Sequence, residues 1–233
     1  MEALILAAGL GSRLRPYTNK IPKAMVPFKG TEIIRHQIDL LLSENISKIT
    51  IVSGYRSKEL KDFIKKNFSE EIKIVENKKF SKTNSAFSAM KVLKNFRSNY
   101  LHLNCDILFS KDTLKRLINS PKENVICVRN DISLQDHMEN VIEINGRIVN
   151  MALRASPEAK FKAFGLAKIS QSALKKNLDF YETLKKDIQE KENYFGMIRM
   201  NLGKLSYHAL KCDYSNLSEI NTVEDLENCK FRF

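Results

Sequence analysis

The stretch from residue 4 to residue 23, LILAAGLGSRLRPYTNKIPK, decides how this chain folds. Residues 4–6 are a short apolar run that is typical of a buried strand. The residues after this run are small and let another molecule approach the backbone closely; they are Ala7, Ala8, Gly9 and Gly11. A buried strand that leads into a loop with free backbone N–H groups is typical of a phosphate-binding site.

The rest of this stretch adds fixed cations and turns. Arg13 and Lys23 place positive charge on the loop, while Pro16 and Pro22 fix φ and lack N–H groups. We therefore expect the chain to wrap a ligand here instead of continuing as a long helix. A dinucleotide-binding fingerprint requires glycine where Leu14 stands, and the Gly-Lys-Ser/Thr of a Walker A loop is absent from the stretch.

The stretch resembles the signature of nucleotidyltransferases that activate sugar 1-phosphates and related phosphate monoesters. That signature reads Gly-x-Gly-Ser/Thr-Arg-Leu/Met-x-Pro-x-Thr-x-x-x-Pro-Lys. The chain matches it without a gap at Gly9, Gly11, Ser12, Arg13, Leu14, Pro16, Thr18, Pro22 and Lys23. The resemblance implies an α/β fold of the GT-A-like type: a Rossmann-like mixed, mostly parallel sheet flanked by helices, with a small acceptor-binding subregion.

The resemblance also assigns roles within the stretch. Arg13 would neutralise the leaving β,γ-phosphates, and Lys23 would contact the α-phosphate and the incoming group. The nucleotide-binding positions that it implies in the loop are Leu6, Ala7, Ala8, Gly9, Leu10, Gly11 and Ser12.

Composition sets outer bounds on the kind of protein. The chain has 233 residues, of which 43% are hydrophobic and 28% charged, as in an ordinary globular protein. The formal charge of +12 raises the question of nucleic acid, but the lysines are scattered at spacings typical of solvated helix faces. We expect no nucleic-acid partner, and we interpret the charge as surface solvation with some steering of anionic ligands.

Cysteine spacing and hydropathy bear on the compartment. The four cysteines are far apart and include no Cys-x-x-Cys pair, so reduced buried thiols are favoured over a zinc site. No apolar run approaches the ~20 residues of a membrane span, and the N-terminal segment does not resemble a signal peptide. We expect a cytoplasmic protein that does not interact with membranes.

Hydrophobic periodicity over residues 1–130 predicts strands that alternate with helices. Helical spacing marks residues 32–43, 57–67, 85–94 and 111–119, and strand patterns mark 48–53, 71–76, 99–104 and 124–128. This alternation implies crossover connections and a largely parallel sheet. Ligands bind beyond the carboxyl ends of such strands, so the glycine loop and Asp106 are expected to face one crevice.

The pattern changes after about residue 130. The dipeptide Asn145-Gly146 predicts a hairpin between two short apolar runs. Further elements are expected as strands at 164–169, 205–210 and 217–220, and as helices at 170 to about 190 and 223–228. Because no linker is evident, we expect one domain over 1–233, with a nucleotide-binding half over about 1–130. The half over about 131–233 would bind the acceptor and carry a metal segment.

The resemblance also implies a Mg²⁺ site. Asp106 follows its strand as the first metal-binding aspartate of the family does, and residues 218–226 (SEINTVEDL) resemble the family's Glu-Ile-Asp/Asn-Thr-x-Glu-Asp-Leu segment. Asn221 stands where many relatives have aspartate, and Glu219 would ligate the metal or lie beside it. Mg²⁺ is typically held by one or two carboxylates and by phosphate oxygens. Judged on residue type alone, Asn221-Thr222 is equally a turn and helix cap.

Residues 83–88 (TNSAFS) indicate the branch of the family. Sugar-nucleotide enzymes have a Gly-Thr-Ala type motif in this region, whereas this segment resembles the Asn-Asn-x-x-Ser segment of bacterial phosphocholine and phosphoglutamine type cytidylyltransferases. By this resemblance Asn77, Thr83 and Asn84 lie near base and ribose. A loop with a helix N-cap is the alternative.

The acceptor side is predicted from fewer residues. Lys160 or Lys162, just before Phe164-Gly165, would hold the phosphate of the acceptor by resemblance to the family. A choline cage is best built with tryptophan, of which the chain has none, so Tyr181, Tyr194 and Phe195 would have to substitute. An amino-acid phosphate suits the basic surface better than choline does.

Together these features predict a Mg²⁺-dependent cytidylyltransferase. It would transfer CMP from CTP to a small phosphate monoester, such as phosphoglutamine or phosphocholine, and release pyrophosphate. The CDP-activated product would serve the decoration of capsule or other surface polysaccharide. The alternatives are a sugar-1-phosphate nucleotidylyltransferase that uses UTP or dTTP, and a nucleotide-binding sensor or partner subunit without catalysis. The oligomeric state is left open, with a dimer among the alternatives.

Overall fold

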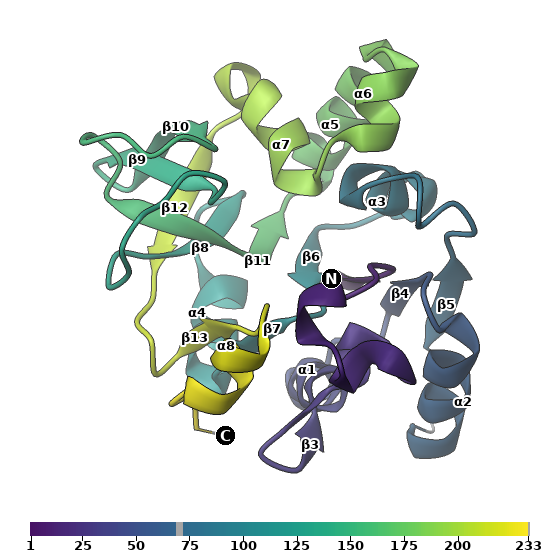
Figure 1. The fold of residues 1–233 in the computed structure, drawn as a ribbon. Helices are drawn as coiled ribbons and strands as arrows, with labels where there is room; N and C mark the ends of the chain where they lie inside the picture. Colours follow the sequence, from purple (N-terminus) through teal and green to yellow (C-terminus); the bar gives the residue numbers. More distant parts are fainter. Residues whose placement is uncertain (69–71, 233) are drawn as a thin grey trace.

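The computed structural model describes residues 1–68 and 72–232. A nine-stranded sheet runs through it in the order β5-β4-β1-β6-β11-β8-β12-β10-β9 (Figure 1). Its strands are β1 (Glu2–Ala7), β4 (Ile49–Ser53), β5 (Lys73–Glu76), β6 (Tyr100–Asn104), β8 (Val125–Arg129), β9 (Asn140–Ile144), β10 (Arg147–Ala152), β11 (Phe161–Ile169) and β12 (Tyr207–Lys211). Short strands pair outside this sheet: β2 (Pro27–Phe28) with β3 (Thr31–Glu32), and β7 (Ile107–Phe109) with β13 (Leu217–Glu219).

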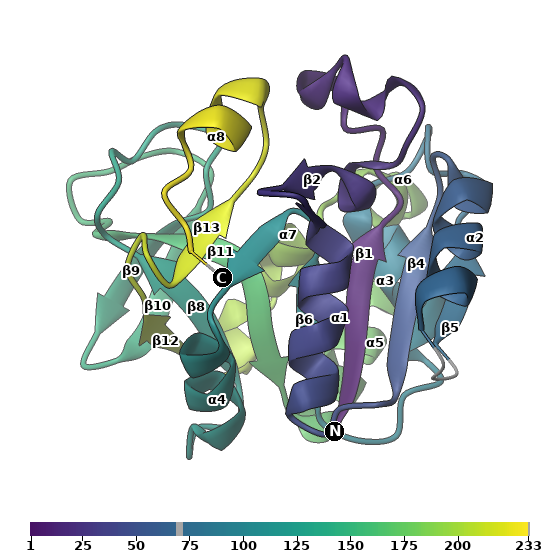
Figure 2. The ribbon, with the colours of Figure 1, turned by 90° about the horizontal axis from the view of Figure 1, so that it is seen from below.

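The helices cover both faces of the sheet. They are α1 (Ile33–Ser43), α2 (Ser57–Asn67), α3 (Ser85–Leu93), α4 (Lys111–Asn119), α5 (Gln171–Thr183), α6 (Lys186–Lys191), α7 (Tyr194–Met200) and α8 (Val223–Asn228). Figure 2 shows α1 and α4 on one face, with α3, α5 and α7 behind the other. The expected α/β class with a mixed sheet and flanking helices is confirmed.

Strand directions divide the sheet. Neighbouring strands are parallel from β5 through β4 and β1 to β6, and again between β8 and β12. The strand β11 is antiparallel to β6, β8 and β9, and it joins the two halves of the chain. The glycine loop follows β1 and Asp106 follows β6, so both lie at the carboxyl ends of adjacent parallel strands.

Alternation of side chains along β1 builds a core on each face. Leu4 and Leu6 pack in the cluster of α3, α5 and α7, whereas Ala3 and Ile5 pack in the cluster of α1, α2 and α4. Because both faces are covered, β1 reads as a continuous apolar run instead of an alternating one. Burial on both sides fixes where β1 ends and therefore where the loop begins.

A third, smaller cluster lies at the end of the sheet that carries the loop. It joins the segment after β1 to the C-terminal segment, and its members are Leu14, Val26, Phe28, Ile33, Leu108, Ile220, Cys229 and Phe231. Figure 2 shows the N-terminal loop and α8 at this same end. The cluster brings two segments about two hundred residues apart in the chain to one place, as the separation between its members Leu14 and Ile220 shows.

Most expected elements are present, and the differences have local causes. The helix expected from 170 to about 190 is two helices, because Leu184 and Lys185 are extended and Tyr181 exchanges hydrogen bonds with Gln189.

The helix α7 was not expected; Asn193 caps it by accepting from the Gly196 N–H at 2.6 Å. The strands β2, β3 and β7 were also missed. The strand expected at 71–76 begins outside the described residues, and β5 confirms the rest of it.

Candidate functional site

The loop after β1 closes on itself at Gly11. This residue is left-handed, with φ of 61°, and a Cβ there would lie 3.0 Å from Lys23 Cβ and 3.1 Å from Thr18 Cγ2. The Thr18 hydroxyl donates to the Gly11 carbonyl oxygen at 2.9 Å. Glycine therefore serves both the backbone conformation and the close approach of the segment that carries Lys23.

The two cations of the loop meet the two metal positions expected from the sequence. The Lys23 ammonium lies 2.6 Å from Asp106 Oδ2 and 2.9 Å from Asn221 Oδ1. Arg13 Nη2 donates to the same Asn221 oxygen at 2.9 Å. Residues from the first, middle and last parts of the chain thus form one charged cluster, held at the end of the sheet by the third core cluster.

Electrostatics keep this cluster charged. Burial opposes the charge on Lys23, but the negative groups around it, Asp106 first among them, together outweigh burial and raise the pKa of Lys23 above its ordinary value. Burial also favours a neutral Glu219, yet its ion pair with Lys162 holds the pKa of Glu219 below its usual range. The ion pairs Lys23–Asp106 and Lys162–Glu219 place charged groups close to Asn221.

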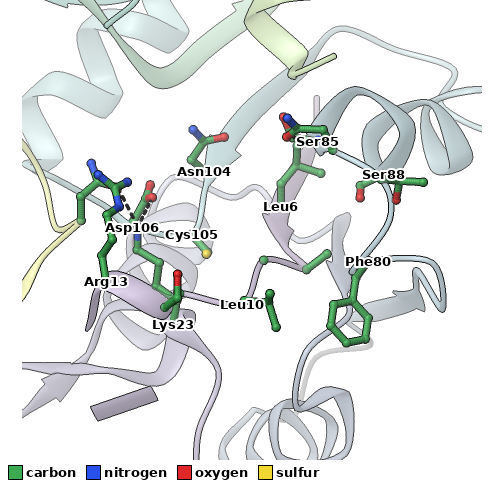
Figure 3. A pocket seen from close by; sticks show the side chains of 17 residues that line it. Leu6, Leu10, Arg13, Lys23, Phe80, Ser85, Ser88, Asn104, Cys105 and Asp106 are labelled. Atoms are coloured by element: carbon green, nitrogen blue, oxygen red, sulfur yellow. Dashed lines mark hydrogen bonds and ion pairs between the residues drawn. The ribbon is translucent and has the colours of Figure 1, made fainter. Parts of the chain in front are cut away.

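The loop and the cluster line a first cavity of about 430 Å³ (Figure 3). Of the expected nucleotide-binding positions, the lining includes Leu6, Ala8, Gly9, Leu10, Gly11, Ser12, Thr83 and Asn84, together with Arg13, Lys23, Asp106 and Asn221. Ala7 is not part of the lining because its side chain packs in the core under the loop. The structure thus places most of the expected nucleotide site around one space.

Asn77 lies behind this cavity and not in its wall. Its side chain is 1% exposed, and its amide donates to Thr83 Oγ1 at 3.0 Å and to Ser88 Oγ at 2.9 Å. It therefore orders residues that do line the cavity. Asn84 lines the cavity, and it also caps α3 through the Ser85 N–H as the alternative expected.

Several lining residues were not expected from the sequence. They are Phe80, Ser85, Ser88, Asn104 and Cys105. Ser85 and Ser88 fall inside the segment that indicated the branch, so that motif is a signal for them. Asn104 and Cys105 precede Asp106 at the end of β6, where a polar side chain after an apolar strand was the available signal.

The expected acceptor residues are only partly brought to the site. Lys162 pairs with Glu219, two residues from Asn221, whereas Lys160 points elsewhere and donates to the Pro157 carbonyl oxygen at 3.2 Å. Tyr194 is 1% exposed and its hydroxyl bonds that of Tyr100. Tyr181 is also buried and donates to the Gln189 carbonyl oxygen. Phe195 is buried in the same core, so packing removes all three rings from any acceptor surface, which corrects that expectation.

A second cavity of about 600 Å³ lies beside the first and shares Arg13 and Asn221 with it. Its wall carries cations, carboxylates and aromatic rings, among them Arg129, Lys162, Phe164, Tyr214, Glu219 and Glu224. The Arg129 guanidinium lies 5.3 Å from the Phe164 ring centre and 4.7 Å from that of Tyr214, and the Lys162 ammonium lies 4.6 Å from Phe164. The protein's own cations therefore cover these aromatic faces.

The residues present fit a magnesium ion that is held largely by substrate. Asp106 Oδ1 is buried and has no hydrogen-bond partner among the described residues, which leaves a carboxylate oxygen available beside Asn221. Within residues 1–68 and 72–232 no three His, Cys, Asp or Glu side chains gather as a protein-only metal cage. One carboxylate and one amide oxygen match the usual way in which Mg²⁺ binds with nucleotide phosphates.

Comparison with known proteins agrees with this geometry. The nucleotidyl transferase family model matches residues 2–128, which include the loop, the first cavity's α3 wall and Asp106. The chain belongs to the nucleotidyl transferase family. Five residues of the signature line the first cavity: Gly9, Gly11, Ser12, Arg13 and Lys23.

Two curated nucleotidyl transferases are similar in sequence. The CTP:phosphoglutamine cytidylyltransferase of Campylobacter jejuni subsp. jejuni serotype O:2 is 31% identical over 253 residues, covering 97% of this chain and 98% of that protein. The choline-phosphate cytidylyltransferase of Streptococcus pneumoniae is 38% identical over 101 residues, 43% of each chain. The solved CTP:phosphocholine cytidylyltransferase structure from Streptococcus pneumoniae matches with a TM-score of 0.80 at 21% identity, covering 97% of this chain and 96% of that one.

The helices that the structure describes carry no sign of a membrane span. Across the part of the chain that the structure describes, none of them has both the length and the apolar character needed to traverse a bilayer.

Proposed function

We propose that this nucleotidyl transferase is a Mg²⁺-dependent cytidylyltransferase that moves CMP from CTP to a small phosphate monoester and releases pyrophosphate. The observation that carries the proposal is the convergence of Arg13, Lys23, Asp106 and Asn221 on one cavity whose floor is the glycine loop. CTP is favoured over other nucleotides because the full-length relative from Campylobacter jejuni is named for it.

The chain's own residues account for binding and positioning. Backbone N–H groups of the loop and the Arg13 guanidinium would hold the β,γ-phosphates and stabilise pyrophosphate as it leaves. Lys23 would balance charge on the α-phosphate, at the place where its ammonium now contacts Asp106 and Asn221. The acceptor phosphate is already ionised, so its oxygen attacks the α-phosphorus without a general base.

Asp106 and Asn221 are the residues that would hold Mg²⁺. The chemistry that the ion supplies when bound is neutralisation of negative charge on the nucleotide oxygens. Asp106 contributes its free Oδ1, and Lys162 keeps Glu219 from competing as a second free carboxylate by pairing with it. We therefore propose Glu219 as a charge beside the metal position and not as a ligand.

For the acceptor we propose an amino-acid phosphate such as phosphoglutamine over phosphocholine. The second cavity offers cations and carboxylates to a zwitterion, while Arg129 and Lys162 already cover the aromatic faces that a quaternary ammonium would need. The product would be a CDP-activated group, which we propose is made in the cytoplasm and used to decorate capsule or another surface polysaccharide. Reduced thiols at all four cysteines are consistent with that compartment.

A screen of nucleotides against acceptors tests the proposal. Pyrophosphate release is measured with CTP, UTP, dTTP and ATP, each against phosphoglutamine, phosphocholine and glucose 1-phosphate in the presence of Mg²⁺. We expect the highest kcat/KM for CTP with phosphoglutamine. Preference for UTP or dTTP with glucose 1-phosphate would instead show a sugar-nucleotide enzyme, and tight CTP binding without turnover on any acceptor would show a nucleotide sensor.

A further inference from the structure

A series of contacts connects the buried side chains of Tyr100, Tyr194 and His102 to Asn104, which lines the first cavity. The imidazole of His102 on β6 is fully buried and stacks on the Tyr194 ring, with ring centres 3.8 Å apart and planes 7° apart. His102 Nε2 lies 3.2 Å from Asn104 Oδ1, and Asn104 lines the cavity. The Tyr194 hydroxyl is in turn bonded to that of Tyr100. Buried core residues therefore contact the side chain of Asn104, which lines the cavity.

The orientation of the Asn104 amide, with Oδ1 facing His102, decides which nitrogen of the imidazole carries the hydrogen. A carboxamide oxygen only accepts, so Nε2 of His102 must carry the hydrogen and donate to Oδ1. The other ring nitrogen, Nδ1, is buried without a partner among the described residues, which suits a bare nitrogen better than an N–H group. The amide nitrogen of Asn104, which has no hydrogen-bond partner within residues 1–68 and 72–232, is then left to the cavity.

The strand β11 leaves room for this side chain. A Cβ on Gly165 would lie 2.3 Å from both Cγ and Nδ2 of Asn104, so glycine is required for Asn104 to occupy its position. β11 pairs with β6 and itself carries Lys162, which lines the second cavity. Asn104 therefore lies at the boundary between the nucleotide loop and the proposed acceptor half.

The direction of the reaction favours the acceptor as the partner of Asn104. In phosphoryl-group chemistry the attacking and leaving oxygens lie roughly in line with the phosphorus. The leaving pyrophosphate is assigned to Arg13 and the loop, so the acceptor must enter from another wall of the cavity. Figure 3 shows Asn104 away from the loop residue Leu10, between the Arg13–Lys23–Asp106 group and Ser85.

We propose that Asn104 donates from Nδ2 to the phosphate of the acceptor, and that His102 is a positioning residue that holds the amide in this orientation. The proposal rests on the nucleotidyl transfer proposed above, but it does not depend on which nucleotide is used. It makes Asn104 a determinant of acceptor binding that the signature motifs do not contain.

The kinetic test uses the full chain and the best substrate pair of the screen. Asn104→Asp keeps the oxygen that His102 bonds and replaces the N–H donor by a negative oxygen. We expect the acceptor KM to rise roughly tenfold or more while the CTP KM stays within about twofold. Asn119→Asp, an exposed change of equal charge at the end of α4, is the matched control and should leave both values unchanged.

His102 is tested by a pair of variants. His102→Phe keeps a ring against Tyr194 but removes the donor, and we expect it to raise the acceptor KM about three- to tenfold. His102→Gln restores an N–H donor and should recover part of that loss. In the folded wild type, nitrogen-15 NMR of His102 should show hydrogen on Nε2, and this measurement does not depend on activity.

The outcomes separate the two proposals. An unchanged acceptor KM in Asn104→Asp, or hydrogen on Nδ1 of His102, overturns the role of Asn104 and His102 and leaves the proposed function standing. If the wild type prefers UTP with a sugar 1-phosphate, the cytidylyltransferase proposal is overturned. A higher KM for that sugar 1-phosphate in Asn104→Asp would still support the role of Asn104. A wild type that transfers nucleotide to no acceptor overturns both.

Discussion

At the scale of single residues, the site depends on a small number of charges that have few partners. Asp106 is the clearest case, because one carboxylate oxygen contacts Lys23 and the other is buried without a partner among the described residues. An unpaired buried oxygen costs free energy, so its presence indicates a function and not a contribution to stability. The neutral oxygen of Asn221, by contrast, accepts from both the Lys23 ammonium and the Arg13 guanidinium.

Replacing Asp106 by Asn is expected to abolish most activity without unfolding the protein. The amide keeps the size of the side chain but removes the negative charge that pairs with Lys23 and that we propose binds Mg²⁺. We expect kcat/KM to fall by about a hundredfold or more, which corresponds to roughly 3 kcal/mol of transition-state stabilisation. Pyrophosphate release measures the loss, and circular dichroism confirms the fold. A variant with wild-type kcat/KM would remove Asp106 from the mechanism.

His102 gives a pH-dependent contribution to stability. Burial lowers the pKa of His102 to about 3, against about 6.5 in an unfolded chain. Between these values the unfolded state binds a proton that the folded state does not, so stability decreases as the pH falls below about 6.5. The contribution is about 1.4 kcal/mol per pH unit.

His102→Phe removes this contribution. Denaturant unfolding of wild type and variant between pH 7 and pH 4.5 measures it, and the carboxylates common to both proteins cancel in the difference. We expect the stability of the variant relative to wild type to improve steadily as the pH falls. If the free energy of unfolding of the two proteins changed with pH in parallel over that range, His102 would be protonated in the folded protein or exposed to solvent.

At the scale of elements, the position of the cavity wall depends on how β11 fits against β6. These strands are antiparallel, and Gly165 on β11 faces Asn104 at the end of β6. The sequence suggested a strand here but not its role, since a glycine in a strand only indicates a close approach of some kind. The group that approaches Gly165 closely is the Asn104 side chain on the neighbouring strand β6.

Gly165→Ala is expected to displace Asn104 while the sheet persists. The added methyl group would overlap the Asn104 amide at 2.3 Å, and overpacking of this kind costs about 1–3 kcal/mol. We expect a lower melting temperature and an acceptor KM that rises as it does in Asn104→Asp. Gly203→Ala, where a Cβ meets nothing within 4 Å, is the control. An equal acceptor KM in Gly165→Ala and Gly203→Ala would contradict the close contact between Gly165 and Asn104.

At the scale of the whole molecule, the charged cluster exists because the two ends of the chain pack together. Phe231 is fully buried beside Phe28, with ring centres 6.4 Å apart, in the cluster that also holds Leu14 and Ile220. Leu14 follows Arg13, and Ile220 precedes Asn221. Packing between the termini therefore sets the distance between Arg13 and Asn221.

Phe231→Ala tests this coupling of stability and function. Removal of a buried aromatic ring costs about 3–5 kcal/mol, and here the loss falls on the contact between the termini. We expect the melting temperature to drop and the KM for CTP to rise in protein that is still folded at low temperature. Phe96→Ala, in the core of the opposite helical layer, is the control for stability alone. A KM that rises equally in both variants would show a general effect of destabilisation.

The sequence by itself determined the strand–loop at the N-terminus, the alternation of strands and helices and the family, because these depend on local spacing and residue type. It also named Arg13, Lys23, Asp106 and Asn221, and the structure brings these four together. Only the tertiary structure decided that Tyr194 packs inside, that Glu219 pairs with Lys162 and that Asn104 faces the cavity. The physical reason is that each of these depends on contacts between elements distant in sequence, which local periodicity does not encode.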